Sequence, residues 1–151
     1  MIKYIHINDC NRTDLTRILN DKMVRRHLVD HPEFGPDEIE EWVKQKAKVD
    51  KDPNCRVRGI VIKGELAGWC GIQVENGQYD LGIILSPAFW GYGHTVFWDL
   101  LKWSKELEHK EVFIHLLESR PESKAIQRRI GASITSTQMM GRSFRSYKIS
   151  V

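Results

Sequence analysis

Polar and apolar residues alternate along three consecutive stretches in the middle of the chain, and this period of two is typical of half-buried strands. A Lys-Gly pair at 63–64 separates the first two stretches. An Asn-Gly pair at 76–77, a strong hairpin signal, separates the last two. We therefore predict an antiparallel meander of three strands, at 56–62, 66–75 and 78–85.

Four other stretches have apolar residues three and four positions apart, which is the spacing of one helix face. A residue that favours a helix start stands before or in each: Asp9 or Asn11, Pro36, the glycines at 91 and 93, and Ser119 with Glu122 three positions later. The last three helices are expected to end near 50–53, 108 and 131. The stretch 22–34 between the first two is predicted to be irregular.

Further strands are predicted at the N-terminus (1–7), at 112–117, and as a final hairpin formed by 134–140 and 144–149. The element order becomes β-α-α-β-β-β-α-β-α-β-β. Because helices and strands alternate around a meander, the fold class is α/β (α+β), with a mixed, mostly antiparallel sheet covered by helices on its faces.

Composition narrows the class of protein. The 151 residues correspond to one domain, and 41% hydrophobic and 28% charged residues are typical of a globular protein. No stretch approaches the roughly 20 apolar residues of a membrane span. Asn8 and Asp9 interrupt the N-terminal run before a signal sequence could form, so we expect a cytoplasmic protein. Three cysteines without a CxxC spacing suggest neither disulfides nor a zinc site.

Charge is unevenly distributed. The segment 119–151 has seven basic residues and one acidic residue, a net charge of +6. Because the whole chain has a net charge of +3, the rest of it has a net charge of −3. Such a segment could contact a phosphorylated ligand, an acidic protein or nucleic acid, or could be a solvated surface. Because no groove-reading motif accompanies it, a nucleic-acid-binding module is the least favoured reading.

A glycine turn between a predicted strand and a predicted helix is the chemically informative stretch. Gly91 and Gly93 stand directly before the helix, where unsatisfied backbone N–H groups and the helix dipole favour an anion. Glycines also let a diphosphate approach the main chain closely. The turn lacks the Lys-Ser/Thr ending of a P-loop and the third glycine of a dinucleotide fingerprint. An anion cradle and a purely conformational role both remain open at this point.

The sequence here resembles the GNAT (Gcn5-related N-acetyltransferase) superfamily. Residues 85–93, Leu-Ser-Pro-Ala-Phe-Trp-Gly-Tyr-Gly, look like the pattern V/L-x-P-x-Y/F-W-G-x-G, and Ser123 to Gly131 looks like the downstream S-x7-G helix. The resemblance is specific from about 56 to 132, and the nearest subgroup contains ribosomal-protein N-terminal acetyltransferases. It implies one acyl-CoA N-acyltransferase domain over 1–151, with acetyl-CoA between the splayed parallel strands 78–85 and 112–117.

The resemblance also implies the cofactor contacts. Main-chain groups of Ile83, Ile84 and Leu85 would pair with the pantetheine arm, and an amide near Leu85 would polarise the thioester carbonyl. The remaining implied cofactor-binding residues are the amides that would hold the diphosphate, Phe89, Trp90, Gly91, Tyr92, Gly93 and His94, together with Arg120, Ser123 and Lys124 near the later helix start. No metal is implied.

Departures from the family pattern concern the proton donor. The usual tyrosine general acid falls on Gln127, and the usual Asn that opens the downstream motif is Arg120. Ser123 takes the place from which some relatives hydrogen-bond the leaving thiolate. Because a thiol has a reference pKa of about 8.5, it leaves readily as thiolate and a weak donor suffices.

Candidate general bases lie on the two splayed strands. Asp80 takes the place of the acidic residue found in many relatives, although a residue so close to a hairpin turn could simply be exposed. Glu118 and His115 are the alternatives, and because they are an odd number of residues apart, only one of them can face the gap if the strand continues. The catalytic candidates are therefore Asp80, Ser123 and Glu118.

The function expected from these features is transfer of an acetyl group from acetyl-CoA to a primary amine by direct attack. The alternative, motivated by Arg120 and Gln127, is a non-catalytic acyl-CoA-binding or regulatory module of the same fold. The amine acceptor, a small molecule or a peptide N-terminus, is not readable from the sequence. We expect no membrane or nucleic-acid partner, and a homodimer is left open.

Overall fold

The structure is a computed structural model that describes residues 1–26, 32–117, 133–139 and 142–151. Its centre is a seven-stranded sheet with the order β1-β2-β3-β4-β5-β7-β6. Within the described residues all neighbouring strands are antiparallel except β4 and β5. The strands are β1 (Ile2–His6), β2 (Arg56–Ile62), β3 (Glu65–Glu75), β4 (Gln78–Leu85), β5 (Glu111–Leu117), β6 (Ser133–Met139) and β7 (Arg142–Ser150).

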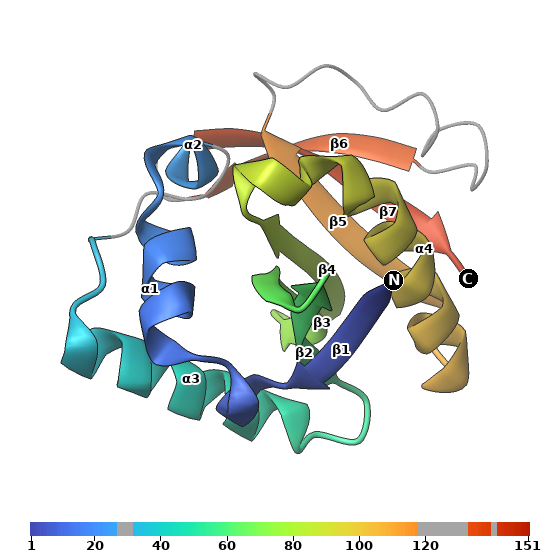
Figure 1. Ribbon diagram of the computed structural model, residues 1–151. Helices are drawn as coiled ribbons and strands as arrows, with labels where there is room; N and C mark the ends of the chain where they lie inside the picture. The colour runs from blue at the N-terminus through green and yellow to red at the C-terminus, as the bar shows by residue number, and fades with distance from the viewer. Residues whose placement is uncertain (27–31, 118–132, 140–141) are drawn as a thin grey trace.

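Helices cover both faces of this sheet, as Figure 1 shows with α1 and α3 on one side and α4 on the other. The described helices are α1 (Arg12–Asn20), α2 (Lys22–Arg25), α3 (Pro36–Asp50) and α4 (Gly93–Glu106), with short 3-10 turns η1 (Ile7–Asp9) and η2 (Pro87–Tyr92). The predicted α/β class and mixed sheet are confirmed. The predicted helix at 119–131 lies outside the described residues.

Turn chemistry sets the strand boundaries. Asn76 and Gly77 both have positive φ, 51° and 77°, as a type I′ hairpin turn requires. Lys63 and Gly64 form the same kind of turn with φ of 54° and 79°. The predicted meander is therefore confirmed, with strand ends displaced by at most one residue at its second strand.

Helix starts follow the predicted caps. Asn11, rather than Asp9, caps α1 by accepting a hydrogen bond from the N–H of Asp14 at 2.9 Å. Pro36 is the first residue of α3. The prediction that 22–34 is irregular is wrong in one part, because the short helix α2 lies within it. The Asp21 carboxylate caps this helix by accepting hydrogen bonds from the amides of Met23 and Val24.

Two apolar cores lie on opposite faces of the sheet. The larger is formed with α4 and includes Leu81 and Leu85 of β4, Ile114 of β5 and Tyr147 of β7. The smaller lies against α1 and α3 and includes Trp69 of β3. Since side chains alternate along a strand, even-numbered residues of β4 and β7 and odd-numbered residues of β5 face the α1 and α3 side.

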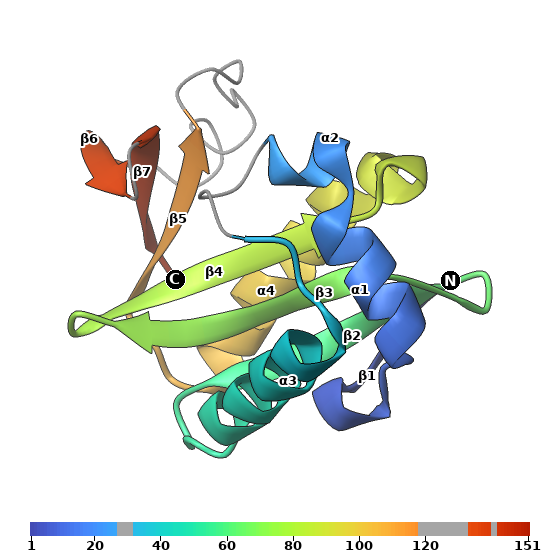
Figure 2. The same cartoon turned by 90° about the vertical axis from the view of Figure 1, so that its left-hand side faces the viewer.

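The parallel pair β4–β5 is short. Only Asp80 with Phe113 and Leu81 with Ile114 are in register, and both strands continue beyond these pairs. Figure 2 shows β5 leaving β4 at a steep angle, with β7 and β6 following it. The sheet therefore opens into a gap beside the last four residues of β4.

Candidate functional site

Main-chain groups line the β4 side of this gap. The amide of Ser86 donates to the carbonyl oxygen of Ala67 in β3 at 2.7 Å. In an antiparallel ladder, residues that bond to the neighbouring strand alternate with residues that do not, so this bond tells which residues of β4 face β3. By that alternation Ile84 turns its N–H and C=O towards β3, whereas Ile83 and Leu85 turn theirs towards the side that β5 has left. Two peptide groups therefore face the gap without a strand partner there.

The side chain of Trp90 hydrogen-bonds one of these main-chain groups. Its indole Nε1–H donates to the carbonyl oxygen of Leu85 at 2.8 Å, although the side chain itself is 41% exposed. The Trp90 ring therefore fixes the end of β4. Because only the carbonyl is engaged in this bond, the N–H of Leu85 remains directed at the gap. Phe89 packs at the edge of the α4 core, next to Tyr92.

The glycine turn has the properties of a cradle for an external group. A Cβ built on Gly91 or Gly93 would meet no atom of the described chain within 4 Å, and neither residue has positive φ. Neither internal packing nor backbone conformation therefore requires glycine here. The amides at the start of α4 also have no side-chain cap, and no acidic residue stands in its first turn. The amides of Phe89 and Gly93 donate within the turn, to the carbonyl oxygens of Ser86 and Trp90, so an anion placed there would be attracted chiefly by the positive end of the α4 dipole and by close approach over the two glycines.

A group of polar side chains crosses the sheet where β4 and β5 begin to separate. Asp80 Oδ1 lies 3.3 Å from His115 Nε2, and His115 Nδ1 lies 2.6 Å from Ser146 Oγ. The side chains of Asp80 and His115 are 18% and 17% exposed, and Ser146 is buried. The alternative that Asp80 is simply exposed is therefore wrong.

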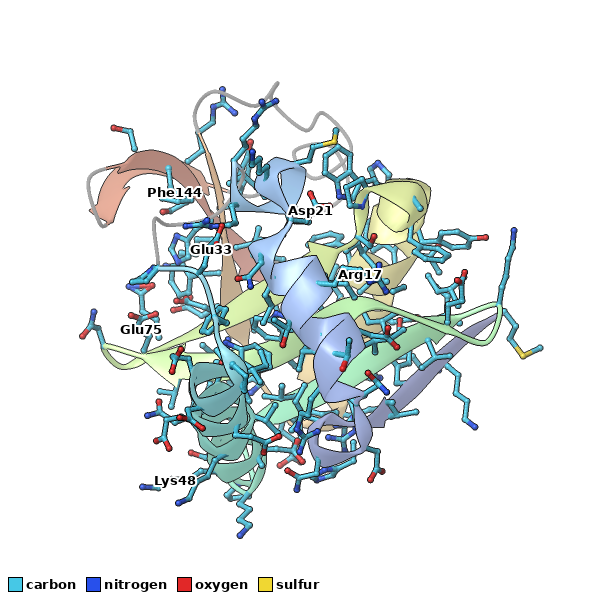
Figure 3. All side chains as sticks on the ribbon, turned by 60° about the vertical axis from the view of Figure 1, so that its left-hand side comes forward. Arg17, Asp21, Glu33, Lys48, Glu75 and Phe144 are labelled. Atoms are coloured by element: carbon cyan, nitrogen blue, oxygen red, sulfur yellow. The ribbon has the colours of Figure 1, made fainter. Side chains whose placement is uncertain are left out.

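This group continues towards α3. Gln73 lies opposite Asp80 in the β3–β4 register, and its Oε1 accepts a hydrogen bond from Lys46 Nζ at 2.5 Å. Lys46 turns inward over the Trp69 ring, whereas Lys48 of the same helix points away from the molecule (Figure 3). Burial lowers the pKa of Lys46 to about 8, against an opposing effect of Glu75.

A shallow groove of about 380 Å³ lies along α3. Carboxylates and aromatic rings line it: Phe34, Asp37, Glu38, Glu41, Trp42 and Gln45. Asp37 and Glu38 stand in the first turn of α3, where the helix dipole accounts for them. The groove is on the same side of the sheet as Asp80.

The structure brings part of the predicted site together. Asp80 and the gap-facing residues of β4 are at the split, and the turn 89–94 follows at the end of β4. The predicted residues Glu118, Arg120, Ser123 and Lys124 lie outside the described residues. Ser146 was not among the predicted residues, because its contact with His115 depends on the β5–β7 register.

The part of the chain that the structure describes contains no metal cluster and no membrane-spanning helix. No group of three or more metal-ligating side chains that could hold an ion occurs among the described residues. None of their helices is long and apolar enough to cross a membrane.

Known structures share this fold. The microcin C7 self-immunity acetyltransferase MccE, in complex with acetyl-CoA and AMP, matches with a TM-score of 0.76 at 14% identity over 99% of this chain and 92% of its own. The spermidine N-acetyltransferase of Vibrio cholerae, with CoA and spermine, matches with a TM-score of 0.75 at 15% identity over 99% and 94%.

An acetyltransferase that modifies the N-terminal serine of ribosomal protein L7/L12 in Salmonella typhimurium also matches, with a TM-score of 0.73 at 13% identity over 99% of this chain and 94% of its own. A comparison with curated proteins gives no significant match. The family model described as "Acetyltransferase (GNAT) domain" matches residues 3–133. Because this match covers most of the chain, it shows that the chain belongs to the GNAT acetyltransferase family.

Proposed function

We propose that residues 1–151 act as one acyl-CoA N-acyltransferase domain that moves an acetyl group from acetyl-CoA to a primary amine. When bound, acetyl-CoA supplies the acetyl group as an activated thioester. The observation that carries the proposal is the pair of open features at the end of β4: peptide groups that have no strand partner among the described residues, and two glycines with free space around them.

These features fit the parts of acetyl-CoA in order along the chain. The peptide groups of Ile83 and Leu85 can pair with the amides of the pantetheine arm as a missing strand would. The N–H of Leu85 is fixed by its place at the end of β4 and can donate to the oxygen that becomes negative during acyl transfer. The amides of 89–94, with Gly91 and Gly93, can hold the diphosphate.

Acid–base roles are assigned to three residues. Asp80 is proposed to accept the proton of the attacking amine, because it lies at the split and is only partly buried. Ser123 is proposed to hydrogen-bond the leaving thiolate, with Arg120 and Lys124 near the cofactor phosphates. Glu118 is the alternative base at the end of β5.

Calorimetric titration with acetyl-CoA, with CoA and ATP as comparisons, tests the cofactor part of the proposal. We expect stoichiometric binding of acetyl-CoA with a micromolar dissociation constant, and no comparable binding of ATP. A folded protein that does not bind acetyl-CoA would contradict the proposal and favour a non-catalytic module that acts through other partners.

The acceptor is then sought in an amine panel. Polyamines, aminoglycosides and peptides with a free N-terminus are incubated with acetyl-CoA, and free thiol is measured as it appears. Because the relatives of similar fold include enzymes for spermidine and for a protein N-terminus, both classes belong in the panel. Release of thiol that depends on one amine identifies the acceptor class.

A further inference from the structure

Three polar side chains from adjacent strands form a row on the α1 and α3 face of the sheet. Asp80 of β4, His115 of β5 and Ser146 of β7 lie there at separations of 3.3 and 2.6 Å. His115 is the first residue of β5 beyond its last registered pair with β4. Its ring therefore stands where the gap opens.

One acceptor in this row, Asp80 Oδ1, receives no hydrogen bond. Asp80 Oδ1 is buried and has no hydrogen-bond partner of good geometry, although His115 Nε2 lies within ion-pair distance. When a neutral imidazole carries its proton on Nδ1, it donates to Ser146 Oγ and leaves a bare Nε2 facing Asp80 Oδ1. A protonated imidazole donates from both nitrogens, to Asp80 Oδ1 and to Ser146 Oγ. The cationic form would therefore satisfy the buried carboxylate oxygen.

We propose that His115 holds the proton lost by the amine during acetyl transfer, and that Asp80 and Ser146 position its ring and stabilise its charge. This inference rests on the proposed function and changes the role of Asp80, which acts through His115 instead of keeping the proton itself. Ser146 holds the Nδ1 proton in both states, because its hydroxyl oxygen accepts from Nδ1–H and leaves Nε2 as the nitrogen that gains and loses the proton.

The reaction step balances without a further reactant. The amine nitrogen forms a bond to the acetyl carbon, and the bond between that carbon and the CoA sulfur breaks. The electron pair of the broken bond leaves with the sulfur as thiolate. The N–H proton passes to the bare Nε2 of His115, which later releases it to water.

The other charged side chains on this face of the sheet contact residues other than His115. Lys46 of α3 reaches Gln73, which lies opposite Asp80 on β3. Glu111 of β5 and Lys148 of β7 form an ion pair at 3.3 Å at the opposite end of these strands from the gap. Within the described residues, Asp80 is the charged group that lies within 4 Å of His115.

Kinetics of His115→Gln test the inference once an accepted amine is known. We expect kcat to fall about 100-fold or more, the range of general acid–base catalysis, with KM for acetyl-CoA unchanged within twofold. The rise of kcat with pH on the acid side should disappear. His109→Gln is the matched control, because that ring contacts the Asn54 carbonyl away from the gap, and it should behave as wild type.

Ser146→Ala tests whether Ser146 positions the His115 ring or only supports the fold. It keeps the imidazole and removes one hydrogen-bond partner, so kcat should fall about tenfold while the melting temperature stays near that of wild type. If His115→Gln retains wild-type kcat and pH profile in an enzyme that binds acetyl-CoA and acetylates an amine, the inference fails and the proposed function stands.

A second readout needs no acceptor. In ¹⁵N-labelled protein at the lowest pH that preserves the fold, His115 should show two slowly exchanging ring N–H signals, because both nitrogens then donate to buried acceptors. Ser146→Ala should lose the Nδ1–H signal selectively, and Asp80→Asn the Nε2–H signal. Rapid exchange of both signals in the wild type would overturn the inference, whether or not acetyl-CoA binds.

Discussion

Lys46 Nζ lies 4.6 Å from the centre of the Trp69 ring, and the half-buried lysine side chain covers the edge of the smaller core. Its partners are the ring face and the Gln73 carbonyl oxygen, and neither is a carboxylate. Burial lowers the pKa of Lys46 from 10.5 to about 8. Protonated Lys46 is therefore less stable in the folded than in the unfolded chain.

The pH dependence of stability follows from this shift. Between pH 8 and 10.5 the unfolded chain binds more protons at Lys46 than the folded chain does, so the contribution of Lys46 to stability rises with pH in that window. Below pH 8 the unfavourable contribution is complete. Lys46→Met should raise the free energy of unfolding by about 1 kcal/mol at pH 7.

Chemical denaturation at pH 7, 8, 9 and 10 measures this effect. The stability difference between Lys46→Met and wild type should shrink as pH rises. Lys48→Met is the control, since Lys48 points into solvent (Figure 3) and should change little at any pH. A difference that stays constant over this range would show that Lys46 is not desolvated.

Gly93→Ala should separate ligand binding from folding. The new Cβ meets open space at the first residue of α4, so stability should be unchanged or higher by up to about 1 kcal/mol. Affinity for acetyl-CoA should fall about tenfold or more, which corresponds to about 1.4 kcal/mol. Gly93→Glu adds negative charge and should abolish binding. Calorimetry and thermal melting measure the two quantities.

Gly77→Ala is the matched glycine control for this experiment. Gly77 has a φ of 77° in the β3–β4 turn, so alanine there should cost about 1 kcal/mol of stability and leave acetyl-CoA affinity intact. Equal affinity losses in Gly77→Ala and Gly93→Ala would argue against a cradle at 91–93.

Gly68→Ala should be strongly destabilising for a different reason. A Cβ at Gly68 would overlap the carbonyl oxygen of Ile84, which is backbone of the neighbouring strand and cannot move aside cheaply. We expect a loss of about 2 kcal/mol or more, measured by denaturation. Gly64→Ala, in an open turn, should cost less.

Asp80→Asn should lower turnover about 100-fold while changing acetyl-CoA affinity by less than twofold, because it removes charge at the split without altering volume. Steady-state rates over pH 6 to 9 and calorimetry measure these effects. Asp14→Asn, on the exposed face of α1, should match wild type. Wild-type turnover by Asp80→Asn throughout this range would remove Asp80 from the mechanism.

Local signals account for most of what the sequence predicted correctly. Turn residues at 63–64 and 76–77 define the meander because they favour positive φ, and the prolines and caps define α1 and α3. The four-residue helix α2 was missed, since it is too short to show a period. Its capping residue Asp21 is the signal that could have found it.

Long-range relationships were not predictable in this way. Lys44, Lys46 and Lys48 are alike in the sequence, and only the packing of α3 on β3 shows that one of them is buried. The contact of His115 with Ser146 depends on strand register over 31 positions. Local sequence patterns place a motif on a helix or strand, but they do not show which helices and strands contact one another.

The two registered pairs between β4 and β5 act as a hinge line between two blocks of sheet. On one side are β1 to β4, and on the other are β5, β7 and β6. Leu81 and Ile114 are buried in the larger core at this line, so we expect their volumes to influence the angle between the blocks and with it the width of the gap. Conservative changes of these two core residues offer a way to tune ligand affinity from a distance, without altering any group that a ligand would touch.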